Sequence, residues 1–439
     1  MSTFSSLASI YANSLLTEWE QCLDEGRDVA AYEERCRDIV KRANENWTPA
    51  LEREAIRLGE EMLAVPVKAD YPYIEPSTLE GIRACRPAGG KVYSPVAGDT
   101  AAVRGAWAGR IAGCLLGKPV EGQRRPRLYP LLKANDNYPL HKYIRKADFA
   151  PDFDGYYDSC WADTLNGLAP NDDDTNYTTF SMIMLEKHGR DFTPMDILNG
   201  WGHYLPCCAT FTAERITYRN AMMGYIPPMT ATYLNPCREW IGAQIRGDFF
   251  GYINPGNPEL AAEMAWRDAS ISHVKNGIYG EMYIAAMLAA AAVTTDIDEI
   301  IDAGLAQIPE KSRLRRDVDA VRAWATQDMT NEAIIDRIHE AYDETTEHGW
   351  CHTNSNAMIV TLGLLRGQGN FGKSICLAVQ AAFDTDCNGA TVGSIIGLRN
   401  RGIPAEWEEP FPKGLRTNID GATVVTLDEV VERTMALMA

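Results

Sequence analysis

The 439-residue sequence lacks a segment that is long and apolar enough to cross a membrane. Its most apolar stretches, such as residues 284–293, are short and rich in alanine, and we expect them to form buried helices. Residues 1–13 also lack the basic start and the apolar core of a secretory signal peptide. These absences predict a soluble protein without a membrane partner.

Cysteine pairs of the CxxC type are absent as well, so no structural zinc site is predicted. The chain has 11 cysteines, an odd number that are mostly scattered singly. Without a signal peptide, such cysteines are typical of a reducing compartment. We therefore expect the protein to be cytoplasmic.

Positive charge is scarce, because 42 Lys and Arg residues face 60 Asp and Glu residues for a net charge of −18. A field of this sign repels phosphate backbones and argues against nucleic-acid binding. A small anionic substrate is still allowed, since a bound metal ion reverses the local sign of the charge.

Patterns typical of β-strands are few, whereas apolar residues recur at helical spacing, and an all-α fold is predicted. Residues 1–95 are expected to form a helical extension, with three helices between residues 7 and 63. This extension is expected to cover the site or to make a contact in a homo-oligomer. Residues 96–439 then form a compact helical domain, in which residues 125–175 and 225–260 are expected to be long loops.

Two acidic clusters each stand at the start of a predicted helix. Residues 171–175 read Asn-Asp-Asp-Asp-Thr, and residues 384–386 read Asp-Thr-Asp. Helix capping is one explanation for the first cluster, and a solvated loop is one for the second. However, capping needs a single Asp, and acids between apolar segments are costly unless they are paired or metal-bound. If the clusters meet in space, their oxygens favour a hard cation such as Mg²⁺.

A glycine appears at every fourth residue of the segment 105–117. These glycines share one helix face, which predicts close packing against another helix. Pro119 ends the helix and leaves Glu121 on a loop. A carboxylate there, close to a metal site, can act as a general acid or base.

Together these segments resemble the motifs of the ADP-ribosylglycohydrolase superfamily, typified by the dinitrogenase-reductase-activating glycohydrolase and the ADP-ribosyl-acceptor hydrolases. The superfamily motif G-x-x-x-G-x-x-x-G-D-x-x-G-x-x-x-E is similar to residues 105–121. Its T/S-D-D-T motif matches residues 172–175, and its D-T-D-T motif matches residues 384–387. The resemblance implies an all-α fold with two Mg²⁺ or Mn²⁺ ions at its centre.

Three positions depart from these motifs. Asp172 and Cys387 stand where the motifs have threonine, and Cys114 stands where they have aspartate. A thiol is a poor ligand for a hard cation. We therefore expect a metal centre with an altered inner shell, in a divergent branch whose substrate need not be ADP-ribose.

The resemblance implies specific roles for the matching residues. The expected metal ligands are Asp173, Asp174, Asp384 and Asp386, to which Asp172 adds a further carboxylate. The expected catalytic residues are Glu121, Asp174 and Asp384. Less specific sequence signals give the candidates for substrate binding, which are Asp248, His273, Tyr279, His352, Asn354 and Asn388. For Asp248 the alternative is an internal salt bridge with Arg246, and for His273, His352 and Asn354 it is a place at a helix start.

The predicted reaction is the metal-dependent hydrolysis of an N- or O-glycosidic bond at the anomeric carbon of a furanose-type, ribosyl-like small-molecule glycoside. One alternative substrate is ADP-ribose attached to a protein or a small acceptor. An alternative from a different class of function is a non-catalytic, crystallin-like member of the superfamily. A metal-dependent phosphohydrolase is disfavoured, because helical sites of that type typically include histidine and neither acidic cluster contains one.

Overall fold

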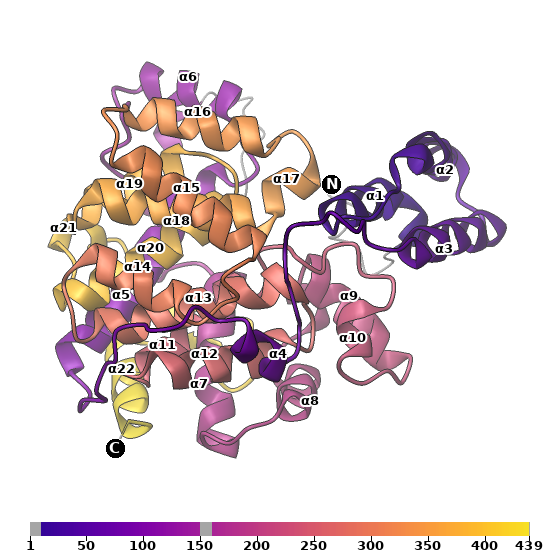
Figure 1. Ribbon diagram of the computed structural model, residues 1–439. Helices are drawn as coiled ribbons and strands as arrows, with labels where there is room; N and C mark the ends of the chain where they lie inside the picture. Colours follow the sequence, from indigo (N-terminus) through magenta and orange to yellow (C-terminus); the bar gives the residue numbers. More distant parts are fainter. Residues whose placement is uncertain (1–9, 150–159, 439) are drawn as a thin grey trace.

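The computed structural model describes residues 10–149 and 160–438, and this part of the chain is almost entirely helical (Figure 1). Two short strands, β1 (Leu415–Arg416) and β2 (Val424–Val425), pair antiparallel near the C-terminus. The predicted all-α class is therefore confirmed. No helix in the described ranges has both the length and the apolar character needed to span a membrane.

The helices fall into three groups along the chain. The N-terminal group comprises α1 (Leu15–Asp24), α2 (Glu33–Asn46), α3 (Pro49–Ala64) and α4 (Leu79–Ala84). The middle group comprises α5 (Thr100–Gly117), α6 (Arg125–Ala134), α7 (Asp173–His188), α8 (Pro194–Tyr204), α9 (Thr212–Met222), α10 (Met229–Thr232), α11 (Asp248–Tyr252), α12 (Pro258–Ala269) and α13 (Lys275–Ala291). The C-terminal group comprises α14 (Ile297–Leu305), α15 (Arg313–Ala325), α16 (Asn331–Ala341), α17 (Glu347–Cys351), α18 (Thr353–Gly367), α19 (Phe371–Gln380), α20 (Thr385–Asn400), α21 (Ala405–Glu408) and α22 (Leu427–Ala436).

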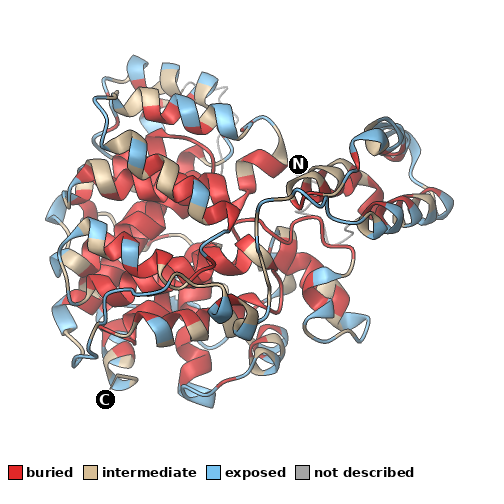
Figure 2. Ribbon diagram, viewed as in Figure 1, coloured by how far each residue is buried: buried red, intermediate tan, exposed pale blue. Residues whose placement is uncertain are grey.

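Three helices, α5, α13 and α20, form the buried centre of the molecule (Figure 2). Their sequences carry alanine, glycine and leucine on all faces rather than on one stripe. A helix of this composition is stable only when other helices surround it. The remaining helices supply that cover with their apolar faces and turn their charged faces to solvent.

Helix α5 and helix α20 approach each other closely enough for their backbones to touch. Glycines of one helix face glycines of the other in three pairs, which are Gly105 with Gly397, Gly109 with Gly393 and Gly113 with Gly389. A Cβ atom at any of these positions would overlap a carbonyl oxygen of the partner helix. The end of α5 is tied to the start of α20, because Thr385 Oγ1 donates a hydrogen bond of 2.9 Å to the Gly117 carbonyl. The glycine face predicted from the sequence is thus a helix–helix contact.

The N-terminal helices α1 to α3 project from the helical body, and the following chain runs back across that body (Figure 1). They share a small apolar cluster of their own. Buried ion pairs join them to the rest: Arg238 lies 2.7 Å from Glu18 and 2.8 Å from Glu25. Further along, Arg313 lies 2.9 Å from Glu75. Breaking such a buried pair costs about 3–5 kcal/mol, so these contacts hold the extension firmly.

The expectation of two long loops was wrong in part, and parts of two expected segments lie outside the described residues. Residues 125–175 and 225–260 are not simple loops, because they contain α6, α10 and α11. Helix α6 has Pro126 in its first turn, where the missing N–H of proline costs nothing because it would have no partner in the helix. Residues 7–9, where the first helix was expected to begin, and residues 150–159 lie outside the described residues.

Substitution of Gly113 by alanine tests the close approach of α5 and α20. The added methyl group would overlap backbone atoms of α20, which can move only together with the rest of that helix. We therefore expect the free energy of unfolding to fall by about 1–3 kcal/mol or more. The control is Gly202→Ala on the exposed face of α8, where no atom lies within 4 Å of the added methyl group. That change should stabilise the protein by about 0.5–1 kcal/mol. Chemical denaturation measures both variants, and equal effects would contradict this account of the packing.

Candidate functional site

The two acidic clusters meet at the centre of the molecule. Asp172 is the N-cap of α7, and its Oδ1 accepts a 3.0 Å hydrogen bond from the Asp174 backbone N–H. Asp384 is the N-cap residue of α20. It follows Ala382 and Phe383, which both have positive φ values, of 66° and 57°. Strained backbone of this kind is retained where a site needs it, and here it directs the second cluster toward the first.

Three groups of possible ligand atoms link the clusters, and within each group the atoms lie within 4.8 Å of one another. The groups are Cys114 with Asp172 and Asp174, Asp174 with Asp386 and Cys387, and Glu121 with Asp384 and Asp386. The structure thus brings Glu121 and four of the five predicted ligands together. The fifth, Asp173, occupies the same first turn of α7 and is less buried than its two neighbours.

The electrostatics of the cluster are unfavourable without a cation. Burial is the main cause that raises the pKa of Asp174 and of Asp386 well above the ordinary value, and neighbouring carboxylates add to it. For Asp384, burial and then the charge of Glu121 raise the pKa to about 7. Asp174 Oδ2 and Asp386 Oδ1 are buried and accept no hydrogen bond among the described residues. Orphaned anionic oxygens of this kind fit a hard divalent cation.

Arg110 holds one side of the site in place. Its guanidinium is fully buried, and Nη2 lies 2.9 Å from Asp174 Oδ1 while Nη1 lies 2.9 Å from Asp248 Oδ2. It also donates to the carbonyl oxygens of Asp174 at 2.9 Å and Ile245 at 2.5 Å. These bonds fix one oxygen of Asp174 and leave the other directed at the second cluster.

A second cation, Lys118, lies within the acidic cluster itself. Its ammonium is 2.5 Å from Asp172 Oδ2, 3.2 Å from Glu121 Oε2 and 3.6 Å from Asp386 Oδ2. Burial alone would lower the pKa of Lys118, but these three carboxylates raise it well above the ordinary value. The lysine is therefore a fixed positive charge that bridges α7 and α20.

The sequence analysis missed the roles of Arg110 and Lys118. A signal was present, because Arg110, Cys114 and Lys118 follow one another at intervals of four residues and share one face of α5. That face lies beside the glycine face, which packs on α20. Lys118, which follows the end of α5, therefore lies near the start of α20, and Arg110 lies against the first turn of α7.

The two unusual cysteines both line the site. Burial is the main cause that raises the pKa of the Cys114 and Cys387 thiols well above the ordinary value, and the surrounding aspartates raise it further. Both therefore stay neutral thiols in the absence of a soft metal. A neutral thiol contributes little to binding Mg²⁺, which leaves the carboxylates as the effective ligands.

Asn388, one of the predicted substrate contacts, lies on α20 shortly after Asp384 and Asp386. Its Nδ2 donates a 2.8 Å hydrogen bond to Asn356 Oδ1, which also accepts a 3.2 Å bond from the Asp384 backbone N–H. Asn388 Oδ1 is buried without a hydrogen-bond donor among the described residues. Asn356 therefore orients the start of α20. The Oδ1 atom of Asn388 is, among the described residues, an unused hydrogen-bond acceptor next to this helix start.

Four other predicted contacts have partners inside the protein. Asp248 pairs with Arg110, so the alternative given for it, a salt bridge with Arg246, is wrong about the partner. Arg246 instead pairs with other carboxylates, Glu214 and Asp268. The remaining three predicted contacts bond elsewhere: His273 to Ser272 Oγ at 2.8 Å, Tyr279 to the Pro76 carbonyl at 2.5 Å and Asn354 to Asp317 at 2.9 Å. Their proposed contacts with substrate stay predictions.

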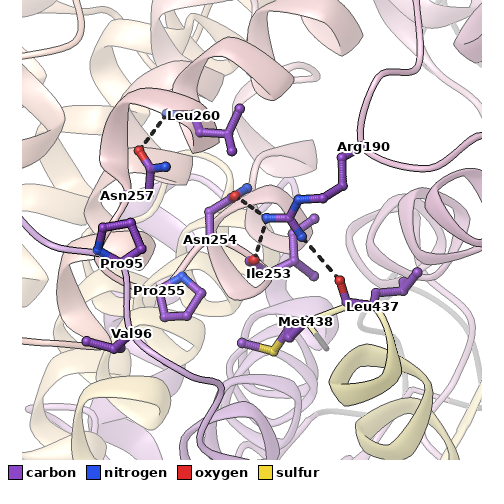
Figure 3. Close-up of a pocket in the computed structure, with 10 residues that line it drawn as sticks. All are labelled: Pro95, Val96, Arg190, Ile253, Asn254, Pro255, Asn257, Leu260, Leu437 and Met438. Atoms are coloured by element: carbon purple, nitrogen blue, oxygen red, sulfur yellow. Dashed lines mark hydrogen bonds between the residues drawn. The ribbon is translucent and has the colours of Figure 1, made fainter.

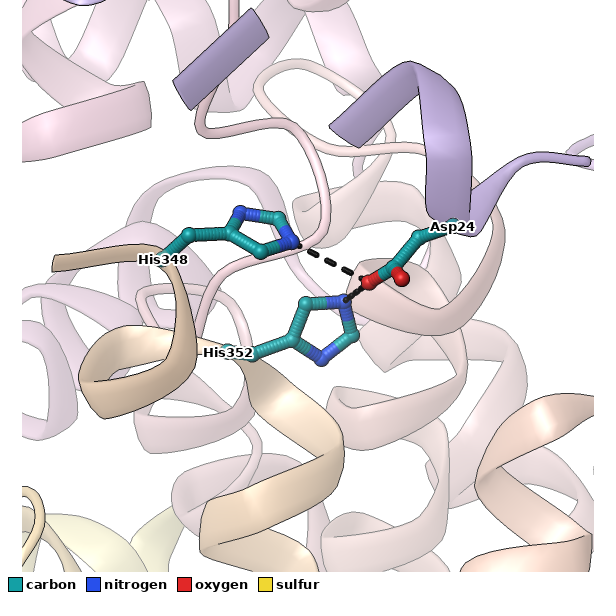
Figure 4. A group of neighbouring side chains, drawn as sticks. All are labelled: Asp24, His348 and His352. Carbon is teal, nitrogen blue, oxygen red and sulfur yellow. Dashed lines mark hydrogen bonds and ion pairs between the residues drawn. The ribbon is translucent and has the colours of Figure 1, made fainter. Parts of the chain in front are cut away.

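His352 belongs to a separate group with Asp24 and His348, where α1 meets α17 and α18 (Figure 4). Nε2 of His348 and of His352 lie 3.1 and 3.6 Å from Asp24 Oδ2. Each Nδ1 accepts a 3.1 Å hydrogen bond, from the Trp240 indole and from the Asn354 backbone N–H respectively. Because these partners can only donate, each neutral ring carries its proton on Nε2. His348 therefore donates a hydrogen bond to Asp24, whereas the Nε2–H of His352 lies beyond hydrogen-bond distance of it and has no acceptor among the described residues. Neither ring presents a lone pair to a metal ion there.

A surface cavity of about 340 Å³ lies away from the acids, between the linker and the C-terminus (Figure 3). Arg190 crosses it and donates hydrogen bonds of 3.0 Å to the Ile253 carbonyl and 3.2 Å to the Leu437 carbonyl. None of the predicted site residues lines this cavity.

A sequence profile described as ADP-ribosylglycohydrolase matches residues 97–436. No curated protein matches the chain. Among solved structures, one described as "ADP-ribosylglycohydrolase-related protein complex" shares 18% sequence identity with a TM-score of 0.45, over 77% of this chain and 97% of that chain.

The histidine group predicts a specific dependence of stability on pH. Burial lowers the pKa of His352 to about 3 in the folded protein, against about 6.5 for an unfolded histidine. As the pH falls below 6.5, the unfolded chain binds a proton that the folded protein refuses, so stability decreases toward pH 3. Between pH 7 and pH 5 this loss is about 2 kcal/mol.

His352→Asn removes the titrating ring and keeps an acceptor for the helix cap, so we expect its stability to fall less between pH 7 and pH 5. His203→Asn, at an exposed position of α8, is the control and should behave like the wild type. Urea denaturation at both pH values measures the slopes. Identical slopes for His352→Asn and the wild type would contradict the assignment.

Proposed function

The chain belongs to the ADP-ribosylglycohydrolase family, a family of glycosyl hydrolases, and on this premise we propose that it is a divalent-metal-dependent glycosidase. The proposed substrate is a small molecule that carries a furanose-type, ribosyl-like sugar. The bond cleaved is an N- or O-glycosidic bond at the anomeric carbon. The observation that supports this proposal most is the meeting of the two acidic clusters beside Glu121.

The residues that would hold a divalent cation are Asp174, Asp384 and Asp386. Two of their oxygens, Asp174 Oδ2 and Asp386 Oδ1, are the buried and unpaired atoms described above. A bound Mg²⁺ or Mn²⁺ would supply Lewis acidity and would anchor neighbouring hydroxyl groups of a sugar. The positive N-terminal ends of α7 and α20 both face this region and add to the stabilisation of negative charge there.

Glu121 is the proposed group for proton transfer. Its side chain is about 20% exposed, whereas those of Asp172 and Asp386 are almost completely buried. A carboxylate at the boundary between the site and solvent can exchange protons with water while it contacts a substrate. The hydrogen bond from Lys118 Nζ at 3.2 Å orients Oε2 of Glu121. The deeper carboxylates would stabilise the positive charge that develops on the sugar ring.

The charge around the site favours a small glycoside over an ADP-ribosylated acceptor. A pyrophosphate needs several cations, but Lys118 faces carboxylates and Arg125 lies 2.5 Å from Asp336. Arg124 remains, with its guanidinium 4.7 Å from the centre of the Trp350 ring and a buried Nη1 without a hydrogen bond in the described chain. One such guanidinium suits a single anionic or planar leaving group. Hydrolysis of ADP-ribosylated acceptors is the second candidate function, and Arg124 is the observation that supports it.

Removal of the divalent cation should abolish hydrolysis. We expect EDTA to reduce the rate to background, and Mg²⁺ or Mn²⁺ to restore it. Asp384→Ala should be inactive under all these conditions, and Glu121→Gln should lose about 10²–10⁴-fold in kcat. Asp328→Ala, an exposed carboxylate on another face, should retain full activity as the control. Full activity in EDTA, or of Asp384→Ala, would contradict the proposed function.

A substrate panel distinguishes the two candidate functions. We expect release of the leaving group from nucleosides and simple furanosides, and little release of ADP-ribose from an ADP-ribosylated peptide. The readout is the free sugar, separated by chromatography, with Asp384→Ala as the blank. Preferential hydrolysis of the peptide would favour the second candidate. No product from any substrate, in a protein that binds metal, would support the non-catalytic alternative.

A further inference from the structure

Lys118 occupies a position inside the site that a metal ion would otherwise need. Its ammonium contacts Asp172 at 2.5 Å, Glu121 at 3.2 Å and Asp386 at 3.6 Å, and its side chain is only 12% exposed. These acids come from α7, from the loop after α5 and from α20. A strongly hydrated ammonium group is removed from water in this way only where carboxylates replace that water.

The chemistry on this side of the site is unsuited to a second hard cation. A further possible ligand on this side is Cys114, whose sulfur lies within 4.8 Å of the ligand atoms of Asp172 and Asp174. A neutral thiol beside an ammonium group offers a divalent cation a poor ligand and a repulsive charge. Two divalent cations, as the resemblance implied, therefore do not fit the residues that are present.

On the opposite side of the site, the described residues place no ammonium or guanidinium group in hydrogen-bond contact with the free oxygens of Asp174 and Asp386. Asp174 Oδ2 and Asp386 Oδ1 are both buried and accept no hydrogen bond from the described residues. A carboxylate oxygen of Asp174 and one of Asp386 lie within 4.8 Å of each other. Arg110 reaches Asp174, but it contacts the other carboxylate oxygen, Oδ1.

We propose that the ammonium group of Lys118 takes the place of one divalent cation, so that the protein binds a single ion on the Asp174–Asp386 side. The proposal deepens the proposed function and rests on it, because it specifies how the metal requirement is met. Lys118 is thereby a positioning residue, which holds Asp172, Glu121 and Asp386 together whether or not an ion is bound.

Binding stoichiometry tests the proposal directly. Titration calorimetry with MnCl₂ should give one site per chain for the wild type. Lys118→Met, which keeps the length of the side chain and removes its charge, should bind two ions. Lys118→Arg keeps the charge and should bind one. Lys373→Met, at an exposed position of α19, is the control and should also bind one.

Electron paramagnetic resonance of the Mn²⁺-loaded proteins provides a second readout that does not depend on activity. The wild type and Lys118→Arg should give the six-line spectrum of an isolated Mn²⁺ ion. Lys118→Met should give the broadened spectrum of two coupled ions. If Lys118→Met does not fold, the wild type and Lys118→Arg still decide the question.

The possible outcomes separate this inference from the proposed function. Two coupled ions in the wild type would overturn the role of Lys118 and leave metal-dependent hydrolysis intact, since the lysine would then move aside. One ion in Lys118→Met with unchanged affinity would overturn it as well. No Mn²⁺ binding by the wild type would overturn both the inference and the proposed metal requirement.

Discussion

The structure depends on the contact between the glycine faces of α5 and α20. Because no side chain separates the two backbones, the end of α5 and the start of α20 are brought to the same point. The residues that follow α5 include Lys118 and Glu121, and the residues that begin α20 include Asp384 and Asp386. One packing constraint thus assembles the basic and acidic groups of the site from positions more than 260 residues apart.

The second constraint is electrostatic, and it connects packing with function. Several carboxylates are buried at one point, where each raises the cost of ionising the others. The protein offsets part of this charge with Arg110 and Lys118. It leaves two carboxylate oxygens without a partner in the described chain. Carboxylates buried in this way favour a nearby positive charge, which is the physical basis for the proposed binding of a divalent cation.

Much of this arrangement could be predicted from the sequence, because it depends on local patterns. Glycine at every fourth residue predicted a helix contact, and acids at two helix starts predicted a shared site. The spacing of Arg110, Cys114 and Lys118 indicates that they share one helix face, but it could not show which acids the lysine contacts, because those acids come from separate segments of the chain. His352 appeared to be a candidate for substrate binding, but its partner Asp24 lies in the extension, more than 300 residues earlier. Long-range partners of this kind are not encoded in any local motif.

The central claim is that the two acidic clusters form one cation site. The most direct measurement is an anomalous difference map from crystals of the full-length protein soaked in Mn²⁺. The account predicts one peak, bounded by Asp174, Asp384 and Asp386, with the ammonium of Lys118 still on Asp172. The absence of a peak at this position, or a peak between Asp24, His348 and His352 instead, would contradict it.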